Sequence, residues 1–249
     1  MNNKGPYLLA DASDAPFPPA ELALREPDGL LAVGGDLSPV RLLNAYAGGI
    51  FPWFSEGQPL LWWSPDPRMV FRTDRVHLSS RFRRTLRSSP WRVRADTAFS
   101  EVMQACAQAP RPGQDGTWIT DDMHRAYVEL HRLGYAHSVE VFDEDQLVGG
   151  IYGVAIGRMF FGESMFSGRS GGSKVALAAL ARTLASWGWP LIDAQVENSH
   201  LLRLGAEQMA RPLFLEQVRQ LVPQNGEVGP WTRVFGEFSA AALAEPAVT

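Results

Sequence analysis

Polar side chains interrupt two otherwise apolar stretches in the C-terminal half of the chain. Asp193 and Gln195 stand two residues apart in the β-type run 191–196, and an extended backbone points both side chains to one face. A carboxylate beside an amide can orient a substrate amine. An edge strand with a polar face explains the same spacing, and the pattern alone favours that plainer interpretation.

Glu163 is unusual for a similar reason, because it lies inside the apolar run 159–166. Burying a carboxylate costs free energy unless the group is paired or serves a function. The three residues Glu163, Asp193 and Gln195 are therefore the candidates for chemistry.

Other common catalytic groups are scarce in this sequence. Cys106 is the only cysteine, which excludes an internal disulfide and a Cys-rich zinc site, and its apolar neighbours predict a small core residue. The five histidines show no HExxH or paired metal-ligand spacing, and no G-x-S-x-G motif occurs. We therefore expect no metal and no cofactor.

The glycine-rich stretch 168–174 precedes an expected helix, and its free N–H groups could bind an anion. The order Gly172, Ser173, Lys174 does not match a Walker loop, and Lys174 stands where acetyl-CoA loops carry a second small residue. A flexible loop explains the stretch equally well.

Positive charge is concentrated in one part of the chain. The whole chain carries −4 at pH 7, yet the window 68–94 holds nine arginines and one acid. Like charges repel, so such a cluster is typical of a surface that binds nucleic acid. Four of these arginines fall within seven residues: Arg81, Arg83, Arg84 and Arg87. Trp53 and Trp118 lie in loop-like contexts and could stack on unpaired bases, although core packing explains most tryptophans.

Length and composition indicate a globular protein. The chain has 249 residues, of which 45% are hydrophobic, enough for one large core or two smaller ones. No stretch approaches 18 apolar residues without charge, and the first twenty residues do not resemble a secretory signal. We expect a cytoplasmic protein without a membrane segment.

Hydrophobic periodicity places these residues on elements. The expected helices cover 39–47, 79–88, 97–108, 121–133, 174–187, 198–204 and 214–222. The expected strands cover 69–71, 137–142, 147–156, 159–165 and 191–196. Ser173 is expected to cap the helix that follows it. Antiparallel strands, one long helix and a further strand predict an α+β fold.

Two prolines around Asp66 make a stiff connector, so we expect a domain boundary there. The predicted domains are a small N-terminal one, 1–67, and a catalytic one, 68–249, with no role assigned to the tail after about residue 236.

Seven segments, in this order, resemble the leucyl/phenylalanyl-tRNA–protein transferases. They are REPDGLLAVGGDL (25–37), GIFPWFS (49–55), LWWSPDPR (61–68), GTWIT (116–120), GGIYGV (149–154), FGESMFS (161–167) and LIDAQV (191–196). The resemblance covers most of the chain.

The resemblance implies an enzyme that moves Leu or Phe, with Met as a minor donor, from aminoacyl-tRNA to proteins that begin with Arg or Lys. These proteins are thereby marked for degradation by the N-degron pathway. It also implies a C-terminal domain with the acyl-CoA N-acyltransferase (GNAT) fold, a mixed sheet with flanking helices. The ester of an aminoacyl-tRNA is already activated, which agrees with the expectation of no metal and no cofactor.

Site residues follow from the same resemblance. Asp193 would orient Gln195 and help to withdraw the proton of the attacking amine, with Glu163 in the same site. The proton acceptor stays open among the carboxylate, the amide and the leaving 3′ oxygen. An apolar pocket for the amino acid would be formed by Ile151, Phe160, Met165 and Leu184. The 3′-terminal adenosine would meet Trp53 and Trp118, with Tyr46 assisting, and the tRNA backbone would contact Arg81, Arg83, Arg84 and Arg87.

Two other classes of protein fit parts of the pattern. An acetyl-CoA-dependent N-acetyltransferase would share the fold, but the defective acetyl-CoA loop and the arginine cluster speak against it. In a non-catalytic RNA-binding protein, Asp193 and Gln195 would be structural.

Overall fold

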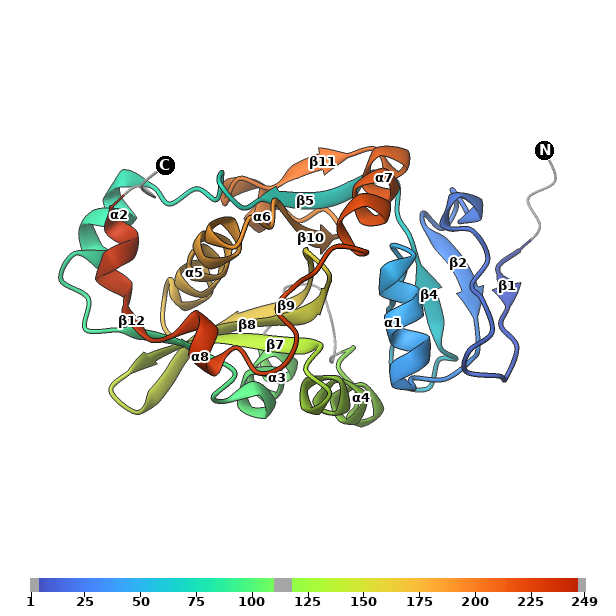
Figure 1. Ribbon diagram of the computed structural model, residues 1–249, viewed down its shortest axis with the longest axis horizontal. Coiled ribbons are helices and arrows are strands. Elements are labelled where there is room, and N and C mark those ends of the chain that lie inside the picture. The colour runs from blue at the N-terminus through green and yellow to red at the C-terminus, as the bar shows by residue number, and fades with distance from the viewer. Residues whose placement is uncertain (1–4, 110–117, 246–249) are drawn as a thin grey trace.

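The computed structural model describes residues 5–109 and 118–245, whose strands form two sheets. Figure 1 shows the smaller sheet at one end of the molecule, with the larger sheet and its helices filling the rest. Gly116 and Thr117 of the GTWIT segment lie outside the described residues.

The smaller sheet has four short strands in the order β1-β2-β4-β3; β1 and β2 are parallel, and the other pairs are antiparallel. Its elements are β1 (Tyr7–Leu8), the 3-10 helix η1 (Ala20–Leu22), β2 (Leu30–Val33), α1 (Pro39–Ala47), β3 (Phe51–Pro52) and β4 (Leu61–Trp63). Helix α1 begins where the sequence predicts, because the Ser38 side chain accepts a hydrogen bond from the Arg41 N–H and Pro39 opens the first turn.

The larger sheet has eight strands in the order β11-β5-β10-β9-β8-β7-β6-β12. Its strands are β5 (Arg68–Arg72), β6 (Arg92–Ala95), β7 (Ala136–Asp143), β8 (Gln146–Ile156), β9 (Met159–Ser167), β10 (Leu191–Gln195), β11 (Glu207–Met209) and β12 (Phe238–Ser239). Its helices are α2 (Ser80–Leu86), α3 (Phe99–Gln108), α4 (Asp121–Arg132), α5 (Gly172–Ser186), α6 (Ser199–Arg203), α7 (Arg211–Leu221), α8 (Thr232–Phe235) and the 3-10 helix η2 (Ala240–Ala244).

The connections of this sheet confirm the predicted mixed α+β class. Strands β6 to β9 form an antiparallel meander, and α5 then crosses over to β10, which pairs parallel to β9. Helix α5 packs on one face of the sheet, whereas α3 and α4 lie against the other (Figure 1). None of the helices in the described residues is long and apolar enough to cross a membrane.

Helices α5 and α7 begin before their predicted starts. Helix α5 begins at Gly172, with Gly171 as its left-handed cap at φ 94°, so Ser173 lies inside the helix rather than capping it. A Cβ on Gly172 would lie 2.3 Å from the Val148 carbonyl oxygen; the missing side chain therefore lets the helix start pack against β8. Helix α7 begins at Arg211, three residues before its predicted start, because Pro212 is tolerated in a first turn.

Buried apolar side chains form two clusters, one of which spans both sheets. It joins residues of the small sheet and α1, such as Trp62, to residues of α3, α4 and α7, such as Met123 and Leu215. The other cluster lies between α5 and the larger sheet. The division into domains 1–67 and 68–249 stays a prediction, since the smaller sheet shares its core with the larger unit.

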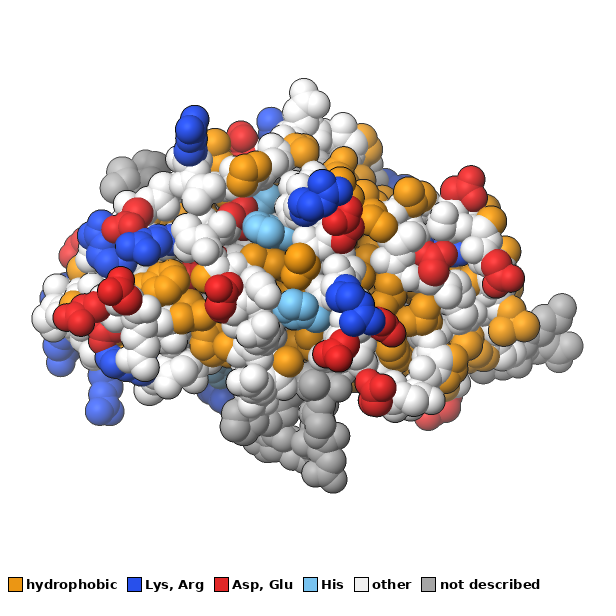
Figure 2. Space-filling view, turned by 90° about the horizontal axis from the view of Figure 1, so that it is seen from below, with side chains coloured by type: hydrophobic (Ala, Val, Ile, Leu, Met, Phe, Trp, Pro, Cys, Tyr) orange, Lys and Arg blue, Asp and Glu red, His pale blue; other side chains and the backbone are white. Residues whose placement is uncertain are grey.

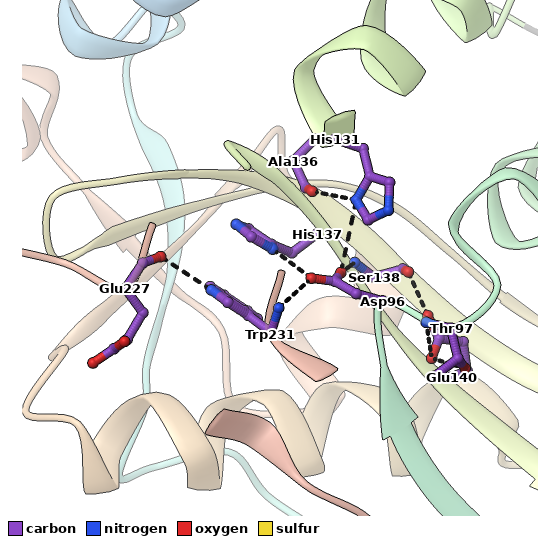
Figure 3. Close-up of polar contacts among 9 residues, drawn as sticks. All are labelled: Asp96, Thr97, His131, Ala136, His137, Ser138, Glu140, Glu227 and Trp231. Atoms are coloured by element: carbon purple, nitrogen blue, oxygen red, sulfur yellow. Dashed lines mark hydrogen bonds and ion pairs between the residues drawn. The ribbon is translucent and has the colours of Figure 1, made fainter. Parts of the chain in front are cut away.

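Asp96 joins the C-terminal segment to the meander (Figure 3). Its carboxylate accepts hydrogen bonds from the backbone N–H of Trp231 at 2.7 Å and of Ser138 at 3.0 Å, and contacts Nδ1 of His137 at 2.8 Å. The His137 ring stacks on the Trp231 ring at 3.9 Å. Two elements that follow residue 236 also pack against the larger sheet and its helices: β12 pairs with β6, and η2 packs against α2.

Candidate active site

The candidate catalytic residues lie where β9 and β10 stop pairing. The two strands are paired from Leu191 and Met159 as far as Asp193 and Phe161. Beyond this point β9 has a bulge opposite β8, because Tyr152 pairs with Ser164 while Gly153 pairs with Gly162, and Glu163 is the extra residue. The register of β10 against β5 also shifts between Asp193 and Gln195. Bulges are common beside active sites because they re-aim side chains.

Glu163 is held by hydrogen bonds from three side chains. Its Oε1 accepts from Nε2 of Gln195 and from the hydroxyl of Tyr46, each at 2.7 Å, and its Oε2 accepts from the hydroxyl of Tyr127 at 3.2 Å. The two tyrosine hydroxyls also contact each other. Burial raises the pKa of Glu163 to about 7, the negative charge of Asp193 adds to the rise, and the three hydrogen bonds oppose it. Glu163 thus titrates near neutral pH.

Asp193 lies behind this group and is completely buried. Its Oδ1 accepts from Nε of Arg68 at 2.8 Å and its Oδ2 from Nη2 of Arg68 at 2.7 Å. Oδ1 also accepts from the backbone N–H of Gln195 at 2.9 Å. Asp193 therefore contacts Gln195 through the backbone, while the Gln195 amide reaches Glu163. Both carboxylate oxygens of Asp193 already accept charge-assisted hydrogen bonds.

One cavity adjoins these residues, and a second cavity shares two lining residues with it. The first, of about 920 Å³, is lined by Glu163, Gln195 and Met165. The second, of about 1050 Å³, is lined by aromatic side chains, including Trp63, and by the carboxylates of Glu56 and Asp121. Trp53 and Trp118 line both cavities, so the two share part of their walls. Aromatic side chains can stack on a nucleobase, and the nearby titratable carboxylate can act on a reacting group. The cavity therefore suits a substrate that carries a nucleobase next to its reacting group.

Of the three residues predicted to contact the adenosine, two line the cavities and one is buried. Trp53 is 36% exposed and its ring lies 5.7 Å from that of Trp63, at the edge of both cavities; Trp118 is half-buried in their shared wall. Tyr46 has no exposed surface, and its hydroxyl serves Glu163. It therefore stands behind the carboxylate and away from both cavity walls.

The four residues predicted to hold the amino acid belong to the apolar region between β8, β9 and α5. Ile151 and Met165 are paired across β8 and β9, and Phe160 and Leu184 belong to the same cluster. Only Met165 lines the smaller cavity; Ile151, Phe160 and Leu184 are buried behind it.

Three of the predicted tRNA-binding arginines lie on α2, and the fourth, Arg87, is its C-terminal cap residue. Arg81, Arg84 and Arg87 are exposed, and Arg83 is half-buried with its Nε donating to the Leu78 carbonyl oxygen. Four other arginines of the basic window are paired with carboxylates: Arg68, Arg72, Arg92 and Arg94. The α2 arginines form no ion pair with a described residue. Figure 2 shows basic side chains, with acidic ones among them, at the end of the molecule where Figure 1 places α2.

Arg68 and Tyr127 are site residues that the sequence did not indicate. Arg68 counted only as part of the basic window, although a cation that opens the apolar run 69–71 needs a partner if it is buried. Tyr127 has the spacing of a core residue on α4. No cluster of three or more metal-ligating side chains occurs within residues 5–109 and 118–245.

Comparison with known proteins adds independent findings. A family model described as leucyl/phenylalanyl-tRNA protein transferase matches residues 70–219, and the model of the N-terminal domain of that enzyme matches residues 35–66. A leucyl/phenylalanyl-tRNA–protein transferase of Xanthomonas euvesicatoria pv. vesicatoria (strain 85-10) is 70% identical over 244 residues, 98% of each chain. That of Xylella fastidiosa (strain 9a5c) is 66% identical over 232 residues, 93% of this chain and 96% of the relative. A solved structure of a conserved protein of unknown function from Staphylococcus epidermidis aligns over 73% of this chain and 68% of its own, with a TM-score of 0.39 and 10% identity, too low to support an argument.

Proposed function

Because the chain belongs to the leucyl/phenylalanyl-tRNA–protein transferase family, we propose that the cavity beside Glu163 and Gln195 is where this aminoacyltransferase joins an amino acid to a protein. The enzyme transfers the amino acid from tRNA to the protein N-terminus. The observation that carries the assignment of the site is the Gln195–Glu163 hydrogen bond on the wall of a cavity shared with Trp53 and Trp118.

The donor tRNA enters with its 3′ end in this cavity. Trp53 and Trp118 stack on the terminal adenosine, since base–aromatic stacking is worth about 1–3 kcal/mol per base. The Leu or Phe side chain points past Met165 toward Phe160, Ile151 and Leu184, and Met is a minor donor because an apolar slot discriminates weakly. This pocket has to open when the donor binds, because three of its four residues are covered in the free protein.

The transfer step needs an acceptor for one proton. The neutral amine of the protein N-terminus attacks the ester carbonyl carbon, the C–N bond forms, and the bond from that carbon to the 3′ oxygen breaks. Glu163 takes the proton that the nitrogen loses and passes it to the 3′ oxygen as that oxygen leaves, which releases tRNA with a free hydroxyl and returns Glu163 to its carboxylate form. Glu163 suits this role because it lines the cavity and its pKa is about 7.

Asp193 is unsuited to accept that proton directly. It has no exposed surface and both its oxygens accept hydrogen bonds from Arg68. Gln195 donates to Glu163 through Nε2, and among the described residues no donor reaches its Oε1. That oxygen is free to accept a hydrogen bond from the incoming amine.

The acceptors are proteins with N-terminal Arg or Lys, and the product feeds the N-degron pathway of protein degradation. The carboxylates of Glu56 and Asp121 in the larger cavity suit a basic side chain. Because aminoacyl-tRNA is the donor, the enzyme works in the cytoplasm. The meander followed by the β9–α5–β10 crossover supports a GNAT-like architecture for the larger sheet.

One assay tests the proposed reaction. Labelled Phe-tRNA is incubated with an Arg-initiated peptide in the absence of ATP and acetyl-CoA, next to the same peptide with an acetylated N-terminus. Label is expected on the free peptide only. Acetylation of the peptide from acetyl-CoA would favour an N-acetyltransferase, and tRNA binding without transfer would favour an RNA-binding protein.

Reversing the charge of two α2 arginines should weaken tRNA binding. In Arg81→Glu with Arg84→Glu, we expect a higher KM for Phe-tRNA and a salt slope that is shallower by about 1.5, since each lost phosphate contact removes about 0.7–0.9. The measurement is KM at several salt concentrations. The control, Arg132→Glu with Arg219→Glu, changes the net charge equally on α4 and α7. An unchanged slope in the α2 variant would remove this helix from the tRNA contact surface.

Enlarging the amino-acid pocket should change the choice of donor. With Phe160→Leu, we expect the ratio of Phe to Leu transfer to rise about three- to tenfold, because about 1 kcal/mol accompanies each added or removed methylene. Competition between the two charged tRNAs measures the ratio. Phe71→Leu is the control, because Phe71 is buried in the same apolar cluster on β5. A ratio equal in both variants would place the pocket elsewhere.

A further inference from the structure

Arg68 is a completely buried arginine that joins three separate parts of the chain. It opens β5, and its two hydrogen bonds reach Asp193 on β10. Its guanidinium carbon lies 4.7 Å from the ring centre of Phe51 on β3 and 4.6 Å from that of Phe214 on α7. Two rings thus fix the plane of the guanidinium, and the carboxylate fixes its direction.

The contacts continue from Arg68 to the cavity. Asp193, held by Arg68, accepts from the backbone N–H of Gln195, whose φ is +61°. A positive φ is uncommon for a residue with a side chain and persists only where its surroundings impose it. With this backbone, Nε2 of Gln195 reaches Oε1 of Glu163 at 2.7 Å.

We propose that Arg68 is a positioning residue for aminoacyl transfer, which acts through Asp193 to hold Gln195 against Glu163. The inference depends on the proposed function of that site. It gives the buried pair a role beyond stability, and it makes the fork shape of arginine part of the requirement. A lysine keeps the charge but offers neither two parallel N–H groups nor a flat face for the two rings.

The first test is Arg68→Lys, with Arg41→Lys as matched control. Arg41 is also completely buried, but it donates to the carbonyl oxygens of Ala10 and Ala12 in the N-terminal segment. For Arg68→Lys we expect kcat to fall about 30-fold or more, with KM for Phe-tRNA and for the Arg-initiated peptide within about twofold of the wild type. For Arg41→Lys we expect kcat within about twofold of the wild type.

The second test is a double-mutant cycle with Gln195→Ala. If Arg68 acts through Gln195, Arg68→Lys should lower kcat by no more than about twofold once Gln195 has been replaced. A purely structural role would make the two losses multiply. Phe214→Leu, which removes one ring but keeps the ion pair, provides the same cycle if Arg68→Lys does not fold, as judged by a thermal melt.

The outcomes separate this inference from the proposed function. Losses that multiply, or a parallel loss of kcat in Arg68→Lys and Arg41→Lys, overturn the role of Arg68. Absence of transfer by the wild-type enzyme overturns the proposed function instead. A large fall in kcat confined to Arg68→Lys, absent in the Gln195→Ala background, supports the inference.

Discussion

Asn in place of Asp193 is expected to slow aminoacyl transfer about 100-fold or more while leaving the affinity for Phe-tRNA within about twofold. The side-chain amide places an NH₂ group against the guanidinium of Arg68, so one of the two hydrogen bonds becomes a clash between donors. The buried guanidinium loses its counter-charge, and the Gln195 backbone loses the charged acceptor that supports its positive φ. Single-turnover rates and filter binding measure the two quantities.

The same substitution should also destabilise the protein, by about 3–5 kcal/mol, the usual result of breaking a buried ion pair. Asp36→Asn is the control, because Asp36 is 38% exposed and lies 3.6 Å from another buried arginine, Arg41. Its melting temperature and rate should both stay close to those of the wild type. If Asp193→Asn weakened tRNA binding as much as turnover, the role of Asp193 would be structural only.

Gln in place of Glu163 is expected to lower the transfer rate about 100- to 1000-fold, the usual contribution of a positioned general base. In the wild type, the rate should rise with pH in two steps. Glu163 must lose its proton at about pH 7, and the acceptor amine must lose its own at about pH 8. In Glu163→Gln the rate should rise in one step only, at about pH 8, where the acceptor amine loses its proton. A pH profile of single-turnover rates measures this.

The raised pKa of Glu163 also makes a prediction about stability. Because its pKa of about 7 lies above the ordinary 4.5, the folded protein binds this proton more tightly than the unfolded chain. The resulting stabilisation is complete below about pH 4.5 and is lost as the pH rises through about 7. The free energy of unfolding of Glu163→Gln should therefore fall less over this range, by at most about 3 kcal/mol, since water in the cavity screens part of the effect.

Glu140 provides the control for both measurements. Burial also raises its pKa to about 7, but it bonds to Ser138 and Thr97 near Asp96 (Figure 3) and lines neither of the two cavities. Glu140→Gln should flatten the pH dependence of stability and leave the pH profile of transfer unchanged. A transfer profile altered equally by both variants would exclude Glu163 as the proton acceptor.

The sequence indicated which polar residues belong to the site, but it did not indicate which of them pair through hydrogen bonds or ion pairs. Glu163, Asp193 and Gln195 were recognisable because polar residues are unusual in apolar runs, and the structure brings them together. Arg68 could not be paired from spacing, since it lies 125 residues from Asp193, and its charge looked like part of the basic window. Tyr127 has the periodicity of a core residue, and only the packing of α4 against α1 shows that its hydroxyl has a polar partner.

The fold was predictable to a similar degree. Long periodic segments such as α5 and the meander of β7 to β9 appear at nearly their expected residues. The short edge strands β11 and β12 carry too few residues to show alternation, and they form because β5 and β6 offer them free edges. The bulge at Glu163 depends on how β8 and β9 pair, which their separate sequences do not reveal.

The apolar cluster shared by the two sheets has a consequence for synthesis on the ribosome. Tyr46 and Trp62 emerge early, but other side chains of the same buried cluster, such as Tyr127 and Phe214, follow much later. The apolar surfaces of these side chains stay exposed until most of the polypeptide has been translated. We therefore expect the N-terminal third of the nascent chain to bind chaperones.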